Sequence, residues 1–266
     1  MRPVMRAVPI EPSALSLDAV DRASARIRSD EAALSDWTDG YLRQHRMRFA
    51  SELDLVDRCL APGSQILDVG AAPFAITAAL ADRGFRLVAV DIDPNRFAGP
   101  VEDLGLEVHA CDIEREALPF ESDSLDAVLF NELFEHLRID PIHTLSEVYR
   151  VLKPGGLLLL STPNLRSFRG LKNLLLRDQA FAVSGGVYRQ FEKLRTLGHM
   201  GHVREYTATE ATEFLQQIGF TVEELVYRGG YGRGLGGLAE RFAPAFRPFF
   251  SAVARRPADS SSAVRS

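Results

Sequence analysis

Short apolar segments alternate with helical patterns along most of the chain, and this alternation constrains the fold more than any other feature. Each segment is rich in Val, Ile and Leu and contains few polar residues, as is typical of strands that are covered on both faces. We expect strands at 65–69, 86–90, 106–110, 124–130, 157–161, 220–227 and 249–254, the last one antiparallel. They predict a doubly wound α/β fold with a seven-stranded, mostly parallel sheet.

The chain of 266 residues is long enough for one large domain with additions. We predict an arm and helix over 1–36, with a loose Pro-containing arm and a helical pattern from Leu15 to Leu34, then one domain over 37–256. A Ser-, Ala- and Arg-rich tail over 257–266 is typical of disorder. About 39 residues, 163–201, separate the fifth strand from the next helix, which is more than a compact connection needs. We expect this insertion to form a lid over the substrate.

Charge and hydropathy limit the partners. The formal net charge of −5 disfavours a dedicated nucleic-acid binder, which usually shows a basic excess. Apolar runs such as Leu157–Leu160 are far too short to span a bilayer, and the first residues show no signal-peptide pattern, so we expect a cytoplasmic protein. A weak amphipathic patch over 234–250 leaves membrane-surface contact as an alternative to packing on the domain.

Acidic residues follow the first two strands of the predicted sheet. Asp68 is followed by the turn residue Gly70, and Asp91 ends the second strand about 20 residues later. In open α/β sheets the ligand lies at the carboxyl ends of the strands, and an acid at this spacing suits paired ribose hydroxyls. The sequence therefore predicts a nucleoside ligand.

Several motifs in this order resemble the class I S-adenosylmethionine-dependent methyltransferases, in particular small-molecule O-methyltransferases of the ubiquinone-biosynthesis type. The resemblance covers roughly residues 40–228. It rests on Ile66-Leu-Asp-Val-Gly70, Val90-Asp-Ile-Asp-Pro94, Cys111-Asp-Ile113, Leu118–Val128, Glu135-His136, Val151-Leu-Lys-Pro-Gly-Gly156 and Gly201-His-Val-Arg-Glu-Tyr206. It implies a Rossmann-like fold and the cofactor S-adenosylmethionine.

The resemblance also implies which residues contact that cofactor. Gly70 and Ala71 would line its methionine part together with Asn131, and Arg48 resembles the anchor of its carboxylate. Asp91 would hold the ribose. The full set of predicted cofactor contacts is Arg48, Asp68, Gly70, Ala71, Asp91, Ile92, Asp112, Ile113 and Asn131, with Asp112 and Ile113 at the adenine.

The loop after the first strand departs from the family pattern. Where the family usually has its second and third glycines, this chain has Ala72 and Phe74. A side chain at the position of Phe74 is expected to prevent close backbone approach unless the loop takes another path. A non-catalytic S-adenosylmethionine-binding module is therefore an alternative function.

An E-x-x-E-H pattern follows the fourth strand. Glu132, Glu135 and His136 would share one face if a helix began there, and two carboxylates with an imidazole suit a divalent ion. In the related enzymes this pattern is associated with a magnesium-type ion near the substrate hydroxyl, so Mg²⁺ is a predicted cofactor. The alternative is a metal-free site with a histidine base.

The resemblance implies methyl transfer to a hydroxyl of a small molecule, phenolic or sugar-like. We predict His136 as the base, oriented by Glu135, with His202 as the rival base or a substrate clamp. The 163–201 insertion carries seven basic and two acidic residues, which indicates either an anionic acceptor or a solvated helix face. A protein or nucleic-acid methyltransferase remains a further alternative, supported only by this basic segment.

Overall fold

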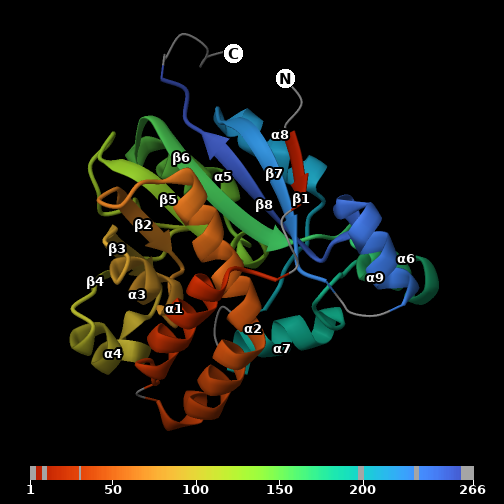
Figure 1. Cartoon of the computed structure of the whole chain (residues 1–266), viewed down its shortest axis with the longest axis horizontal. Helices are drawn as coiled ribbons and strands as arrows, with labels where there is room; N and C mark the ends of the chain where they lie inside the picture. The colour runs from red at the N-terminus through yellow and green to blue at the C-terminus, as the bar shows by residue number, and fades with distance from the viewer. Residues whose placement is uncertain (1–3, 8–10, 30, 197–200, 231–233, 259–266) are drawn as a thin grey trace.

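A computed structural model describes residues 4–7, 11–29, 31–196, 201–230 and 234–258, which form one sheet with helices on both faces (Figure 1). The sheet has eight strands in the order β1-β7-β8-β6-β5-β2-β3-β4. The strands are β1 (Val4–Ala7), β2 (Gln65–Val69), β3 (Arg86–Asp91), β4 (Glu107–Ala110), β5 (Leu125–Asn131), β6 (Leu152–Pro163), β7 (Thr221–Arg228) and β8 (Phe249–Arg255). The doubly wound α/β class is confirmed.

Only β8 runs antiparallel to its neighbours, β6 and β7. The predicted seven strands are all present, and β1 adds an eighth by pairing in parallel with β7. The prediction of a loose arm is therefore wrong for Val4–Ala7. A segment of only four residues shows little apolar pattern in the sequence. Its backbone hydrogen bonds come from the edge of β7, which would otherwise be free.

The helices cover the sheet in two layers because neighbouring residues of each strand face opposite sides. The helices are α1 (Ala14–Ala25), α2 (Ala32–Cys59), α3 (Ala75–Ala81), α4 (Ala98–Asp103), α5 (Pro141–Val151), α6 (Phe168–Arg177), α7 (Val187–Thr196), α8 (Ala208–Ile218) and α9 (Leu235–Phe242). Helices α1, α2 and α3 pack with Ile66 on one face, whereas α5 and α8 pack with Leu67 on the other.

The predicted helix from Leu15 to Leu34 is interrupted. Helix α1 ends at Ala25, and α2 begins at Ala32 and continues to Cys59. Helix α1 begins where the Ser13 side chain accepts a hydrogen bond from the backbone of Ser16, and Ser13 also contacts Asp54 of α2. The two helices lie in front of the sheet in Figure 1, over the strands that carry the predicted cofactor residues.

The predicted 163–201 insertion contains α6 and α7, which lie with α9 beside the carboxyl ends of the strands (Figure 1). The weak amphipathic patch over 234–250 includes α9, where Leu238 and Phe242 are exposed. Most of the predicted disordered tail, residues 259–266, lies outside the described residues. Within the described chain, no helix is both long enough and apolar enough to cross a membrane.

Candidate functional site

A cavity of about 1170 Å³ opens at the carboxyl ends of the central strands. Asp68 in β2, Asp91 at the end of β3 and Asp112 after β4 line it together, because neighbouring parallel strands end at the same edge of a sheet. The predicted contacts Gly70, Ala71, Ile92, Ile113, Asn131 and Arg48 also line it. All nine residues predicted to contact the cofactor thus border one cavity.

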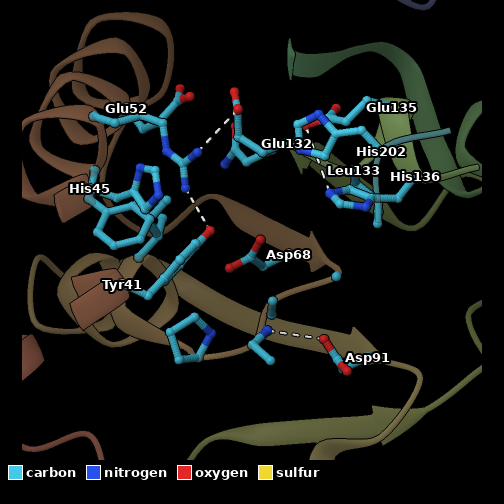
Figure 2. Close-up of a pocket in the computed structure, with 18 of the residues that line it drawn as sticks. Tyr41, His45, Glu52, Asp68, Asp91, Glu132, Leu133, Glu135, His136 and His202 are labelled. Carbon is cyan, nitrogen blue, oxygen red and sulfur yellow. Dashed lines mark hydrogen bonds and ion pairs between the residues drawn. The ribbon is translucent and has the colours of Figure 1, made fainter. Parts of the chain in front are cut away.

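Asp68 and Asp91, on two neighbouring strands, are both held in place by hydrogen bonds (Figure 2). Asp68 is buried and accepts a 2.6 Å hydrogen bond from the Thr77 hydroxyl, and burial raises its pKa to about 7. Asp91 accepts hydrogen bonds from the backbone N–H of Ala72 and of Asp93, each 3.1 Å long. Burial also raises the pKa of Asp91. Asp91 is therefore fixed against the loop that follows β2.

Phe74 does not block this loop. Its backbone has φ 68°, a conformation that favours glycine, and its side chain is fully buried against the edge of the Phe97 ring, 6.0 Å between centroids. Gly70, Ala71, Ala72 and Pro73 border the cavity instead. The loop takes the path that leaves its backbone beside the cavity, so the expected obstruction is absent.

Two features of the cavity wall fit the predicted cofactor. The Asn131 side-chain nitrogen is buried and donates to no acceptor within the part of the chain that the structure describes. Gly70 has φ 67°, a conformation that favours glycine, so no side chain stands between its backbone and the cavity that it lines. A buried amide without a partner is costly, so it is suited to a polar ligand group, and the carboxylates suit a cationic one. This donor set fits S-adenosylmethionine.

Arg48 joins α2 to the turn after β5. Its guanidinium lies 3.1 Å from a Glu132 oxygen and donates a 2.7 Å hydrogen bond to the Tyr41 hydroxyl (Figure 2). Burial alone lowers the pKa of Arg48, but Tyr41 and Glu132 raise it above its ordinary value. Burial raises the pKa of Glu132, against the effect of Arg48. These two side chains are an ion pair at the wall of the cavity.

The E-x-x-E-H segment does not form the predicted helical face. Glu132 has φ 50°, and its N–H donates to Ser161 O at 2.8 Å before a short 3₁₀ turn at Phe134–His136. This turn directs Glu132 toward Arg48 and away from Glu135 and His136. The predicted magnesium set of Glu132, Glu135 and His136 is therefore not assembled, and the residues do not fit such a site.

Glu135, His136 and His202 gather instead on the other side of the cavity (Figure 2). Each offers one ligand atom, and these three atoms lie within 4.8 Å of one another. The imidazole rings meet edge to face, 4.8 Å between centroids. Of the predicted catalytic residues, His202 comes directly after the insertion, so the fold brings it to His136, which is 66 residues earlier in the chain.

The environment of this cluster shifts its protonation. Burial raises the pKa of Glu135 to about 8, and the nearby Glu132 adds to the effect. Burial also lowers the pKa of His136 to about 3, with His202 adding to the effect. In His202 burial is outweighed by Glu205 and Glu135, which raise its pKa. Without a bound ligand, Glu135 and His136 therefore favour their neutral forms near pH 7.

The sequence analysis assigned no role to Glu205, which lies at the site. It is buried, its Oε1 lies 3.2 Å from His202 Nδ1, and it accepts hydrogen bonds from the backbone N–H groups of Ala182 and Ser184 and the Ser184 hydroxyl. It belongs to the Gly201–Tyr206 motif, three residues after His202. That spacing was the available signal.

Helix α2 contributes an aromatic row that the sequence analysis also missed. Trp37 stacks on Tyr41 with centroids 4.8 Å apart, and Tyr41 contacts the His45 ring at 4.4 Å. All three line the cavity. Their spacing of four residues along a helix was visible in the sequence and places them on one face.

The insertion reaches the same cavity. Arg169 of α6, Lys193 of α7 and Ser184 between them line it. Gln190 of α7 accepts a 3.2 Å hydrogen bond from the His202 N–H and donates one of 3.1 Å to Gly185 O. The segment therefore borders the half of the cavity that holds the histidines.

Comparisons with known proteins concern the family and the fold of this chain. A model of the family described as a methyltransferase domain matches residues 41–225. An uncharacterized methyltransferase of Mycobacterium avium is 42% identical over 105 residues, which are 38% of this chain and 40% of that relative. A probable S-adenosylmethionine-dependent methyltransferase of Mycolicibacterium smegmatis is 28% identical over 69% of this chain and 60% of its own length. The chain thus spans less than two thirds of these relatives.

Solved structures show the same fold. A methyltransferase of Haloferax volcanii, solved in complex with the Trm112 methyltransferase activator, aligns with a TM-score of 0.57 and 20% identity over 87% of this chain and 99% of that one. A possible histamine N-methyltransferase of Thermotoga maritima aligns with a TM-score of 0.56 and 19% identity, over 84% of this chain and 97% of the other. At these identities the likeness concerns the fold.

Proposed function

The chain belongs to the methyltransferase domain family, and from this premise we propose that it transfers a methyl group from S-adenosylmethionine to a hydroxyl of a small, anionic acceptor. The observation that carries the proposal is one cavity with two chemically distinct halves. Its volume exceeds the roughly 300–1,000 Å³ of a usual single-ligand pocket, so it has room for cofactor and acceptor together.

The cofactor half contains the strand-end residues. In this proposal Asp91 accepts hydrogen bonds from the ribose hydroxyls, while Asp112 and Ile113 border the adenine. Asn131 supplies its unpartnered amide to the methionine end, where a bound cationic group would favour the charged form of the Asp68 carboxyl. Arg48 is held by Glu132, so it anchors a ligand carboxylate only by sharing its guanidinium with that pair.

The acceptor half contains Glu135, His136 and His202. When bound, S-adenosylmethionine supplies a methyl group on a sulfonium, which is already an activated electrophile. The residues of this chain therefore have to align the acceptor oxygen with that methyl and assist loss of its proton. The transfer forms an oxygen–carbon bond, breaks the sulfur–carbon bond and releases the hydroxyl proton. In this proposal the histidine cluster assists that loss.

The charge of the insertion supports an anionic acceptor. Arg169 and Lys193 both line the cavity, and the Lys193 ammonium acts electrostatically on His136 in the acceptor half. A cation near the acceptor attracts a carboxylate or phosphate, and its distance from the methyl-transfer position selects acceptor length. The aromatic row of Trp37, Tyr41 and His45 offers ring faces to an aromatic or sugar acceptor.

We expect Asp91→Ala to weaken S-adenosylmethionine binding about 100-fold or more, because two hydrogen bonds to a charged group contribute about 1.5–3 kcal/mol each. Asp91→Asn, which keeps one acceptor oxygen, should fall between. Asp103→Ala, an exposed carboxylate at the end of α4, is the matched control. Isothermal titration measures all three. Unchanged affinity in Asp91→Ala would refute the ribose assignment.

The overall proposal is tested in two stages. Calorimetric titration should show S-adenosylmethionine binding and no NAD binding, because the loop lacks the glycines that a pyrophosphate needs. Turnover is then measured by mass spectrometry on hydroxyl compounds with and without a carboxylate or phosphate. Methyl transfer confined to anionic hydroxyl acceptors is the expected result. Cofactor binding without any product would favour the non-catalytic module, and methylation only at nitrogen would refute the hydroxyl assignment.

A further inference from the structure

We propose that Glu135, His136 and His202 form a binding site for a divalent transition-metal ion of the zinc class, with one coordination position open to the acceptor half of the cavity. The purpose given to the ion below rests on the proposed function, but its binding does not. The site differs from the magnesium set predicted from the sequence, because it excludes Glu132 and includes a histidine from the end of the insertion.

The ligand types support this class of ion. Mg²⁺ prefers near-octahedral oxygen ligands, and here two of the three ligands are imidazoles. Two histidines and one carboxylate are a common protein ligand set of catalytic zinc sites, where water or substrate occupies the fourth position. All three residues line the cavity, so that fourth position faces the space where the acceptor would lie.

The histidines are also oriented as metal ligands usually are. His136 Nδ1 lies 3.1 Å from Gly201 O, and His202 Nδ1 lies 3.2 Å from Glu205 Oε1. A ligating histidine usually donates one ring N–H to a carbonyl or carboxylate, which leaves the other ring nitrogen for the metal. Both rings have such a partner at Nδ1, and His136 Nε2 points toward Glu135 Oε1 at 3.9 Å.

Glu135 provides an independent sign of a missing partner. Its Oε2 accepts a 2.8 Å hydrogen bond from Thr162, but its Oε1 is buried and has no hydrogen-bond partner among the described residues. Only 1% of Glu135 is exposed. A buried oxygen without a partner costs free energy unless a ligand satisfies it. Tetrahedral coordination at about 2.0–2.1 Å holds ligand atoms roughly 3.3 Å apart, so side-chain rotations of about an ångström close the site.

An ion at this site would give Glu135, His136, His202 and Glu205 distinct roles in the acceptor half. A divalent ion held by Glu135, His136 and His202 would lower the pKa of an acceptor hydroxyl beside it, so that the hydroxyl proton would pass to solvent at neutral pH. Glu205 would not bind the ion itself but would fix the orientation of the His202 ring through its contact with Nδ1. Because Glu205 also accepts hydrogen bonds from Ala182 and Ser184, the folding of the insertion and the assembly of the site are coupled.

The test is metal binding by the full, untagged chain after chelator treatment and dialysis. Zn²⁺ and Mg²⁺ are titrated separately by calorimetry, and bound metal is counted by mass spectrometry, without cofactor or acceptor. We expect one Zn²⁺ per chain and no Mg²⁺ at similar concentration. Co²⁺ should give the visible absorption of a low-coordinate site with nitrogen ligands.

Variants decide between the two ligand sets. His136→Ala and His202→Ala should weaken Zn²⁺ binding about 100-fold or more, and Glu205→Gln about 10- to 100-fold. Glu132→Gln should keep it, as should His109→Ala, a histidine of the edge strand β4 outside the cavity. Thermal unfolding and S-adenosylmethionine titration confirm that each variant is folded.

Three results would overturn the inference: no stoichiometric Zn²⁺ in the unaltered chain, equal Zn²⁺ binding in folded His202→Ala, or loss in folded Glu132→Gln as large as in His202→Ala. Failure of this test leaves cofactor binding and methyl transfer measurable. Conversely, stoichiometric Zn²⁺ in a chain that methylates no acceptor would support the site and refute the function.

Discussion

Replacing His202 by alanine is expected to lower the turnover number about 10²- to 10⁴-fold, the usual range for losing assistance to proton transfer. His202 stands in the acceptor half, next to Glu135 and His136, so either direct proton acceptance or metal binding is lost with it. The affinity for S-adenosylmethionine should stay within about twofold of the unaltered chain, because the strand-end carboxylates remain.

The measurement is steady-state turnover with an identified acceptor, combined with calorimetric titration of the cofactor. His109→Ala controls for loss of a histidine elsewhere and should keep full turnover. A His202→Ala chain with unchanged turnover would exclude His202 from the chemistry. A parallel loss of turnover and cofactor affinity would instead indicate that the insertion had come apart from the domain.

The second large effect concerns stability. Glu52 of α2 and Arg228 at the end of β7 form a buried ion pair, with 4% and 2% of their side chains exposed. Glu52→Ala leaves the guanidinium buried without its charge partner, which typically costs about 3–5 kcal/mol. For a chain of this size, each kcal/mol lowers the midpoint of thermal unfolding by about 2–4 °C, so we expect a decrease on the order of 10 °C.

Two comparisons identify the cause of that decrease. Replacing both Glu52 and Arg228 by methionine removes the unpaired charge and should restore most of the stability. Asp21→Ala breaks the exposed pair with Arg46 and should cost about 1 kcal/mol or less. Thermal and denaturant unfolding measure all of these chains. If Glu52→Ala were no worse than Asp21→Ala, the pair would not hold α2 on the sheet.

The cofactor half of the site follows closely from the sequence. Asp68, Asp91 and Asp112 each come at or just after an apolar strand, and parallel strands bring such positions to one edge. Their approach to one cavity therefore needed only the strand pattern and the rule that parallel strands are connected by covering helices. The expectation that the last strand is antiparallel is confirmed for β8.

The loop after β2 shows where local reasoning failed. Phe74 was expected to obstruct a glycine-lined site, but its backbone adopts φ 68° and its ring turns into the core against Phe97. The burial of a large ring stabilises by about 1.5–3 kcal/mol, comparable to the cost of a left-handed residue. The direction of a side chain at such a turn depends on the packing available behind it, which the sequence does not show.

The acceptor half depended on tertiary structure for a similar reason. The spacing of Glu132, Glu135 and His136 predicts a shared face only if a helix forms, and a left-handed residue followed by a 3₁₀ turn separates them instead. Arg48, 84 positions earlier in the chain, then takes Glu132 as its partner. Pairing of this kind is decided by which charges become buried together.

The sequence by itself determined the succession of the seven strands β2 to β8 along the chain, the family and the edge of the sheet where the ligand is expected, because periodic apolar patterns and strand-end residues are local properties. The tertiary structure alone decided that β1 completes the sheet, that Glu132 serves Arg48, and that His202 and Glu205 join Glu135 and His136. Those contacts connect segments far apart in the chain, and the burial and hydrogen bonding that select them exist only once the chain is folded.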